Sequence, residues 1–428
     1  MKTEELYSVF KDSTGVTTDT RKIDRGSLFF ALKGENFDGN QFAGEALKKG
    51  ALAVVVDEKN LQGKKGHILV EDTLKALQAL ANHYRKQFKI PFIGITGSNG
   101  KTTTKELITA VLKQKYNVLS TLGNLNNHIG VPLTLLQVDQ STEIAVIEMG
   151  ANKIGDIAEL VAIAQPNYGL ITNIGKAHLE GFGSLEGVIR GKTELYDFLI
   201  KNEGKIFINT HNPILSNMIK RMNDPITYPG KNDFYACEFI SADPYVRLLD
   251  ETGNEVKSGL IGQYNFENIA VALCIGKYFG VDSDRVKKAI EEYDPKNNRS
   301  QIIKKPSCKI ILDAYNANPS SMEGALADFK NIESEKKAVV LGDMNEVGKT
   351  SREEHKKVGQ QVERLNLDLS VFVGEKMLDA SKEVKSSKYF SDKNKLRSYL
   401  EELDFSKYAV LIKGSRSMGL EQAADWID

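Results

Sequence analysis

Cysteine, net charge and long apolar runs are all scarce in this sequence. Its 428 residues include three cysteines, whose positions fit neither a metal site nor an even set of disulfides, so we expect reduced thiols in a cytoplasmic protein. Lysine plus arginine and aspartate plus glutamate both total 57, so no overall field attracts nucleic acid or an anionic membrane. No run approaches the roughly 18 apolar residues of a membrane span, and the N-terminus lacks the apolar core of a signal peptide. We therefore expect no nucleic-acid binding and no membrane insertion.

The length and the apolar content indicate several buried cores. A chain of 428 residues suggests about three domains, and 41% hydrophobic residues argue against disorder. The segments 89–91 and 293–298 interrupt the pattern of apolar runs and are interpreted as linkers. We therefore predict three domains, over residues 1–88, 89–299 and 300–428.

Short apolar runs alternate with amphipathic segments along the chain, which favours α/β domains with mostly parallel sheets. The predicted strands lie at residues 27–32, 51–56, 92–96, 144–148, 168–174, 205–208, 309–312, 338–341, 369–373 and 409–412. The predicted helices lie at 73–88, 103–115, 266–279, 352–364 and 393–402. The last third is typical of a Rossmann-like domain, but no G-x-G-x-x-G follows its first strand, so dinucleotide binding is not expected.

Residues 93–104 have the order that a bound triphosphate requires. They read IGITGSNGKTTT: a strand-like run, a glycine-punctuated turn and the start of a helix. Gly97 and Gly100 let backbone N–H groups approach phosphate oxygens, and the helix N-terminus adds partial positive charge. Lys101 can reach the outer phosphates, and the Thr102 hydroxyl can ligate magnesium.

The general nucleotide loop, G-x-x-x-x-G-K-[ST], would need glycine at position 95, where this chain has Ile95. A glycine-rich turn followed by an exposed lysine is the alternative interpretation. The strand–turn–helix context favours a nucleoside triphosphate site instead. The predicted ATP-binding residues of this loop are Gly97, Ser98, Asn99, Gly100, Lys101, Thr102 and Thr103.

Polar side chains follow the next predicted strands, at the edge where open parallel sheets bind ligands. Glu148 ends an apolar run, and a carboxylate there suits magnesium beside a triphosphate; an ordinary acidic loop residue is the alternative. His178 follows the strand after it, in a polar, glycine-rich stretch that makes a packed-core role less favoured. Lys192 by itself reads as a solvated helix lysine. Because an ammonium repels magnesium, Lys192 could serve a metal only as an anionic carbamate.

The motifs at 96–103, 123–132 and 178–182 resemble the Mur ligase family, the ATP-dependent amide ligases that build the peptidoglycan peptide. The resemblance covers nearly the whole chain. It implies an α/β protein of three domains: a small N-terminal UDP-sugar-binding domain, a central P-loop parallel-sheet ATPase domain, and a C-terminal Rossmann-like domain that binds the incoming amine.

The resemblance also implies the cofactors and the residues that hold them. ATP and Mg²⁺ are required, together with a CO₂-derived carbamate on Lys192. The implied magnesium ligands are Thr102, Glu148, His178 and carbamylated Lys192, and the implied catalytic residues are Lys101, Glu148, His178 and Lys192. Asn268, Arg299 and Asp313 are implied at the ATP.

Within that family, the terminal blocks resemble the branch that joins D-Ala-D-Ala to UDP-N-acetylmuramoyl-tripeptide (UDP-MurNAc-tripeptide). These blocks are residues 18–21, 28–39, 313–322, 341–344 and 413–418. Arg21 can equally be a plain surface charge, and the asparagines at 124–127 can also cap turns. The expected substrate-binding residues are Thr20, Arg21, Lys33, Asn126, Asn127, Asn316, Lys413, Ser415 and Arg416.

The implied reaction has two steps. A substrate carboxylate attacks the γ-phosphorus of ATP to give an acyl phosphate, and the amine of D-Ala-D-Ala then displaces phosphate. We expect a monomer with small-molecule substrates. Two alternatives stay open: a related ligase that uses a diamino acid or glutamate as the amine, and a nucleotide-gated binding protein without ligation.

The chain departs from the family pattern at three positions. Tyr264 stands where histidine is frequent, Asn298 replaces a common glycine, and Asn345 interrupts a usually apolar position. These departures affect the adenine contacts and the domain geometry, and none touches a proposed phosphate or metal group.

Overall fold

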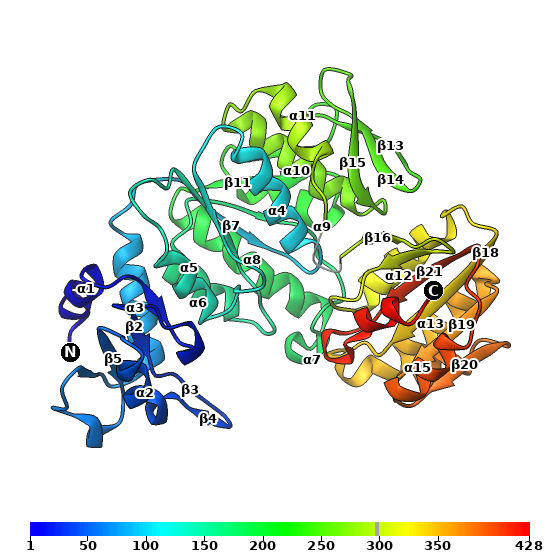
Figure 1. The fold of residues 1–428 in the computed structure, drawn as a ribbon. Coiled ribbons are helices and arrows are strands. Elements are labelled where there is room, and N and C mark those ends of the chain that lie inside the picture. Colours follow the sequence, from blue (N-terminus) through cyan, green and yellow to red (C-terminus); the bar gives the residue numbers. More distant parts are fainter. Residues whose placement is uncertain (296–298) are drawn as a thin grey trace.

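The computed structural model describes residues 1–295 and 299–428 and places them in three α/β parts (Figure 1). In Figure 1 the N-terminal part (blue) lies at the left, the C-terminal part (yellow to red) at the right, and the central part between them. The predicted linker at 293–298 lies partly outside the described residues, and Asn298 lies outside them. The predicted α/β class with mostly parallel sheets is confirmed.

The N-terminal part contains a four-stranded parallel sheet of order β1-β2-β5-β6. Both inner strands are buried along their whole length, as expected for parallel strands with two covered faces. A short hairpin, β3–β4, extends from this part. The elements are α1 (Thr3–Lys11), β1 (Val16–Thr17), β2 (Leu28–Phe30), β3 (Lys33–Gly34), β4 (Phe37–Asp38), α2 (Ala43–Lys48), β5 (Ala53–Val56), β6 (His67–Leu69) and α3 (Thr73–Arg85).

The central part contains a six-stranded parallel sheet of order β12-β11-β10-β7-β9-β8. Its strands are β7 (Phe92–Thr96), β8 (Val118–Ser120), β9 (Ile144–Glu148), β10 (Tyr168–Ile171), β11 (Lys205–Asn209) and β12 (Ile226–Tyr228). Its helices are α4 (Lys101–Leu112), α5 (Gly130–Leu135), α6 (Asp156–Ala164), α7 (Leu179–Phe182), α8 (Leu185–Lys201), α9 (Pro213–Ser216), α10 (Asn265–Tyr278) and α11 (Ser283–Glu291).

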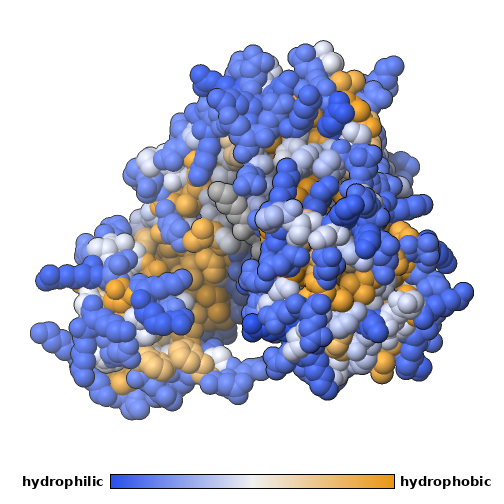
Figure 2. All heavy atoms as spheres, turned by 45° about the vertical axis from the view of Figure 1, so that its right-hand side comes forward, coloured by the Kyte–Doolittle hydropathy of each residue, from blue (hydrophilic) through white to orange (hydrophobic). Residues whose placement is uncertain are grey.

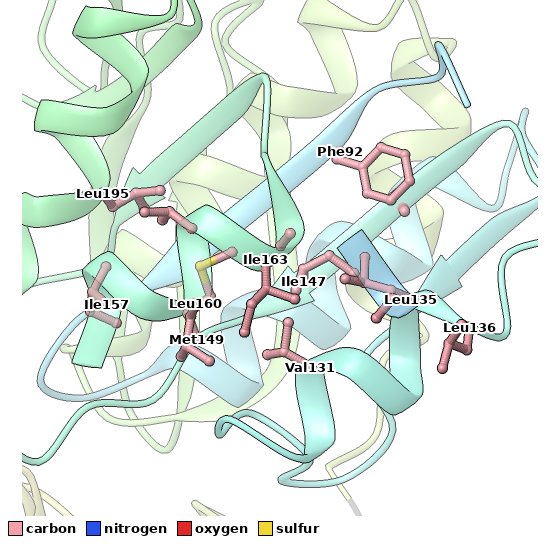
Figure 3. Packing of buried hydrophobic residues seen from close by; sticks show 14 of the residues in the cluster. Phe92, Val131, Leu135, Leu136, Ile147, Met149, Ile157, Leu160, Ile163 and Leu195 are labelled. Atoms are coloured by element: carbon pink, nitrogen blue, oxygen red, sulfur yellow. The ribbon is translucent and has the colours of Figure 1, made fainter. Parts of the chain in front are cut away.

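Alternate residues of the central strands pack into two different cores. Ile147 of β9 joins the core formed with α5, α6 and α8, whereas Val146 joins the core formed with α4, α10 and α11. This alternation follows from the period of two in a strand. Figure 3 shows the first core, with Val131 and Leu135 of α5 and Leu160 of α6 packed near Ile147.

Two local expectations were wrong. The strand predicted at 168–174 ends at Ile171, because the side chains of Thr172 and Asn173 turn to bond the loop after β7. Three antiparallel strands that we did not predict form a separate sheet of order β13-β14-β15. They are β13 (Glu238–Ala242), β14 (Tyr245–Leu249) and β15 (Glu255–Ile261).

The C-terminal part has a six-stranded sheet of order β16-β17-β21-β18-β19-β20, in which β16 alone among the described strands runs antiparallel. The strands are β16 (Gln301–Lys304), β17 (Lys309–Leu312), β18 (Lys336–Gly342), β19 (Leu369–Val373), β20 (Ser387–Phe390) and β21 (Tyr408–Lys413). The helices are α12 (Pro319–Lys330), α13 (Ser351–Leu365), α14 (Met377–Ser381) and α15 (Lys393–Glu401). Among the helices of residues 1–295 and 299–428, none is long and apolar enough to cross a membrane.

Helix α3 attaches the N-terminal part to the central sheet. The buried guanidinium of Arg85 donates hydrogen bonds to the carbonyl oxygens of Ala164 (3.0 Å), Gln165 (2.9 Å) and Phe88 (2.8 Å), and it lies 3.6 Å from the ring centre of Phe92. Burial lowers the pKa of Arg85 to about 10, so the group remains a cation at neutral pH. Three carbonyl groups therefore depend on one buried charge.

We predict that Arg85→Met lowers the free energy of unfolding by about 3 kcal/mol, because three buried acceptors lose a charged donor. Equilibrium unfolding in urea measures the change. Lys86→Met is the matched control, because the neighbouring lysine is exposed. Equal stability of the two variants would contradict the anchoring role of Arg85.

Candidate active site

A cavity of about 910 Å³ lies at the junction of the central and C-terminal parts. Figure 2 shows the surface hollowed between the lower parts of the molecule, with hydrophobic side chains along its left wall and hydrophilic ones along its right. The lining of the 910 Å³ cavity contains most of the residues predicted from the sequence. They are Ser98, Asn99, Gly100, Lys101, Thr102, Thr103, Asn126, Asn127, Glu148, His178, Asn268, Arg299, Asp313, Asn316 and Lys413.

The loop between β7 and α4 has two glycines that cannot be replaced without displacing their neighbours. Gly97 has φ +146° and Gly100 has φ +77°, a region that disfavours other residues. A Cβ atom on Gly97 would overlap the Thr172 hydroxyl, and one on Gly100 would lie 2.6 Å from the Asn268 amide oxygen. The loop therefore packs directly against Thr172 and Asn268.

The end of β10 fixes the same loop by side-chain contacts. The backbone N–H of Asn99 donates to the Asn173 side-chain oxygen (3.0 Å), and the Thr172 hydroxyl donates to the Asn99 carbonyl oxygen (2.6 Å). The Ser98 hydroxyl bonds the carbonyl oxygen of Gly175 (3.0 Å). Sequence reasoning missed Thr172 and Asn173, although polar residues after a buried strand were a usable signal.

Lys101 opens α4 and folds back over the loop. Its ammonium donates to the carbonyl oxygens of Gly97 (2.8 Å) and Ser98 (3.2 Å). Burial lowers the pKa of Lys101 to about 8; nearby Glu148 opposes this shift and Arg299 adds to it. The lysine is thus a cation at neutral pH whose present partners are neutral carbonyls, so an anionic phosphate would be a stronger partner.

Glu148 ends β9 with one carboxylate oxygen paired and one unpaired. Its Oε1 accepts hydrogen bonds from the Thr102 hydroxyl (3.2 Å) and the Asn126 amide (2.7 Å). Its Oε2 is buried and has no hydrogen-bond partner among the described residues. A buried anionic oxygen without a partner fits a divalent cation, which prefers hard oxygen ligands.

No three His, Cys, Asp or Glu side chains in the described part of the chain converge on one point where they could hold a metal ion. A cation bound at Glu148 would therefore take its remaining ligands from other oxygens. The Thr102 hydroxyl and phosphate oxygens of a nucleotide are such donors.

Lys192 of α8 is fully buried, so its interpretation as a solvated helix lysine was wrong. Its ammonium donates to the Ala151 carbonyl oxygen (3.2 Å) and lies 5.2 Å from the ring centre of Phe182. Burial, reinforced by the charge of Lys101, holds the pKa of Lys192 well below its usual range. A neutral amine is the form that reacts with CO₂. The side chain does not line the cavity, but Ala151, its hydrogen-bond acceptor, does.

His178 lies at the cavity and contacts the C-terminal part. It adopts left-handed backbone angles (φ +51°) directly before α7. Its Nδ1 lies 2.7 Å from a carboxylate oxygen of Glu346, and the hydrogen bond with His178 lowers the pKa of Glu346. Glu346 was not predicted from the sequence. The contact leaves Nε2 as the ring nitrogen available to a ligand.

Asn268 and Arg299 line the cavity on the side of α10. The Asn268 side chain accepts from the Thr104 hydroxyl (2.9 Å) and donates to Asn265 (2.8 Å). The guanidinium of Arg299 lies 3.6 Å from the ring centre of Tyr315, a cation–π contact with the C-terminal part. Tyr264, one of the three departures noted in the sequence, also lines the cavity.

The C-terminal residues predicted from the sequence divide into two groups. Lys413 is buried and contacts the Asp313 carboxylate (2.5 Å) and the Asn316 carbonyl oxygen (3.2 Å), and all three residues line the cavity. Ser415 is buried against the segment that follows β18, where its hydroxyl accepts from the Asn345 N–H (2.8 Å). It does not line the cavity. Arg416 is also outside the lining, 5.1 Å from the ring centre of Tyr315.

The N-terminal candidates lie away from this cavity. Arg21 is largely exposed and pairs with Asp19 (2.8 Å), and Thr20 precedes it in a short 3₁₀ helix. Lys33 pairs with Asp57 (2.9 Å) and lines a second cavity of about 480 Å³, together with Phe37 and Phe42. The structure thus brings the central and C-terminal candidates together and leaves the N-terminal ones apart.

Family models match three segments of the chain. Residues 12–85 match the model described as "Mur ligase family, catalytic domain". Residues 95–276 match "Mur ligase middle domain", and residues 298–416 match "Mur ligase, glutamate ligase domain".

Individual relatives align over nearly the full length. The UDP-N-acetylmuramoyl-tripeptide–D-alanyl-D-alanine ligases of Bacillus subtilis and Haemophilus influenzae are 36% and 37% identical, over 95% of this chain and 92% of each relative. A crystal structure of MurF from Acinetobacter baumannii gives a TM-score of 0.89 at 29% identity, covering 99% of this chain and 98% of that one. MurF from Thermotoga maritima in complex with ADP gives 0.85 at 28% identity, covering 97% of each.

We predict that metal-free ADP binding weakens about tenfold between pH 7 and pH 9. The free protein loses the Lys101 charge as the pH rises through about 8, so the phosphates lose a cationic partner. Isothermal titration calorimetry across this range measures the change. Lys101→Arg stays charged throughout and serves as the comparison, with a flatter profile expected. A flat profile for the unaltered protein would contradict the prediction.

Proposed function

The chain belongs to the Mur ligase family, and we propose that it joins D-Ala-D-Ala to UDP-MurNAc-tripeptide with ATP as the energy source. It is an ATP-dependent ligase that forms a carbon–nitrogen bond through an acyl phosphate. The product is the completed peptide of the peptidoglycan precursor. The observation that carries this function is that Lys101 and Glu148 line one cavity, which residues of the C-terminal part also line.

The first step transfers a phosphoryl group between two anions, so charge neutralisation and positioning dominate. Lys101 and the backbone N–H groups at the N-terminus of α4 hold the phosphates of ATP. Asn126 and Asn127 orient the peptide carboxylate for attack on the γ-phosphorus. The adjoining C-terminal part keeps water away from the acyl phosphate until the amine arrives.

Thr102, Glu148, His178 and a carbamylated Lys192 would hold Mg²⁺, which supplies further neutralisation of the phosphate charge. The unpaired Glu148 oxygen supports this assignment. The buried position and lowered pKa of Lys192 support its conversion to a carbamate.

The remaining contacts follow the three parts of the chain, which we assign to domains at 1–88, 89–299 and 300–428. Asn268, Arg299 and Asp313 contact ATP, and Asn316, Lys413, Ser415 and Arg416 position D-Ala-D-Ala. Thr20, Arg21 and Lys33 bind the UDP-sugar end. Ser415 and Arg416 act indirectly, since neither lines the cavity. Ser415 bonds the Asn345 N–H, and Arg416 lies against the ring of Tyr315. We further propose a cytoplasmic location, which is supported by three free, buried cysteines, and a monomeric state.

Direct bonds between the central and C-terminal parts favour a ligase over a nucleotide-gated binding protein. We call the segment between β7 and α4, residues 97–100, the phosphate loop. The Asn318 amide donates to the side-chain oxygen of Asn99 in this loop (2.8 Å). Ser320 accepts from the backbone N–H of Lys176 (2.8 Å), whose ammonium pairs with Glu354 (3.0 Å). The C-terminal part, which we predict to bind the amine, therefore contacts the phosphate loop directly.

The decisive experiment supplies UDP-MurNAc-tripeptide, ATP and D-Ala-D-Ala and follows amide formation by mass. We expect phosphate release and product with D-Ala-D-Ala, and neither with a diamino acid or glutamate as the amine. ATP binding without any amide product would favour the binding-protein alternative. Turnover with another amine would identify a related ligase instead.

The carbamate predicts that Lys192→Ala abolishes ligation in bicarbonate-supplied protein. With ¹³C-labelled bicarbonate, the unaltered protein should show a carbamate signal in its NMR spectrum that this variant lacks. Lys201→Ala, at the exposed end of the same helix, is the matched control and should retain both signal and activity. An active protein with unmodified Lys192 would rule out the carbamate and leave the ligase reaction untouched.

A further inference from the structure

A second buried lysine, which the mechanism above does not use, lies beneath the cavity. Lys105 follows Lys101 by about one turn of α4, and it is only 3% exposed. It does not line the cavity. A buried cation is costly unless polar partners compensate it, so its partners indicate its role.

The Lys105 ammonium bonds a loop that follows β8. It donates to the carbonyl oxygens of Thr121 (2.8 Å) and Gly123 (3.3 Å), and it lies 3.8 Å from the Glu106 carboxylate. We call residues 121–127 the asparagine loop, because they include Asn124, Asn126 and Asn127, which line the cavity. Lys105 therefore fastens the start of this loop to α4.

The asparagine loop in turn fixes Glu148 by two independent bonds. The Thr121 hydroxyl accepts from the Glu148 backbone N–H (2.9 Å), and the Asn126 amide donates to Glu148 Oε1 (2.7 Å). The Asn126 carbonyl oxygen also accepts from the Gly150 N–H (2.7 Å). A Cβ on Gly150 would lie 2.8 Å from the Asn126 side chain, so the two segments are in close contact.

We propose that Lys105 is a positioning residue that sets the affinity of the Glu148 site for a divalent cation through the asparagine loop. The proposal rests on the proposed function of this cavity. Removing the ammonium leaves two loop carbonyls without their donor, and the loop that orients the Glu148 carboxylate loosens. The phosphate loop has its own anchors, Thr172 and Asn173, which directly follow β10. The effect should therefore fall on the metal and spare the nucleotide.

The test compares Lys105→Met, which keeps most of the side-chain volume, with Lys113→Met at the exposed end of the same helix. Mn²⁺ is titrated into the ATP-bound proteins, and free Mn²⁺ is counted by electron paramagnetic resonance. We expect the Mn²⁺ dissociation constant of Lys105→Met to rise about tenfold, the usual effect of losing a group that supports a metal ligand. Metal-free ATP affinity should stay at the wild-type value, and Lys113→Met should match wild type throughout.

Thr121→Val provides the second measurement, because it removes the hydroxyl that holds the Glu148 backbone while leaving Lys105 in place. It should weaken Mn²⁺ binding in the same direction, and it keeps the proposal testable if Lys105→Met does not fold. Wild-type Mn²⁺ affinity in the folded variants, or an equal loss of metal-free ATP affinity, would overturn the proposal. A wild-type protein that binds Mn²⁺ and ATP but forms no amide would refute the proposed ligation alone.

Discussion

The site depends on one buried carboxylate that the protein only half satisfies. Glu148 receives hydrogen bonds at one oxygen, while the other oxygen is buried without a partner among the described residues. Such an arrangement costs free energy in the folded chain and is offset when a cation binds. Thr102 and Asn126 bond this carboxylate directly, and the Thr121 hydroxyl holds the Glu148 backbone N–H.

Sheet order explains why these groups meet. β7 lies between β10 and β9, so the carboxyl ends of three parallel neighbours face one region. The phosphate loop leaves β7, its anchors come from β10, and the carboxylate comes from β9. The loop after β8, next to β9, supplies the asparagines. The chemistry therefore follows from adjacency within a single sheet.

The sequence was most informative where burial is uniform. β7, β9, β17 and β19 have the predicted bounds, because a strand covered on both faces is a continuous apolar run. The β13–β15 sheet was missed because its strands are partly exposed and alternate in burial. The alternation of β14 and β15 is itself a signal of half-buried strands, whereas our prediction relied on continuous apolar runs.

The same distinction applies to the site. Lys101 and Thr102 could be proposed from a local motif, since their roles depend on adjacent residues. Lys105 and Glu346 could not, because their roles come from partners 16 and 168 residues away. The burial of Lys192 was equally invisible in a helix that is rich in charge. Tertiary contact, which no local pattern encodes, decides these positions.

The second cavity, at Lys33, lies on a different part of the chain from the carboxylate at Glu148. If the UDP end of the substrate occupies this cavity, as we propose, the substrate is held at two points, here and in the main cavity. The distance between the two cavities then sets the length of substrate that fits. α3, whose Leu74 also reaches the main cavity, joins the two parts through Arg85. A precursor with a shorter peptide would then be held by its nucleotide end while its carboxylate stopped short of ATP. Substrate length would be checked by the spacing of two parts of the protein, without any side chain that reads the missing residue.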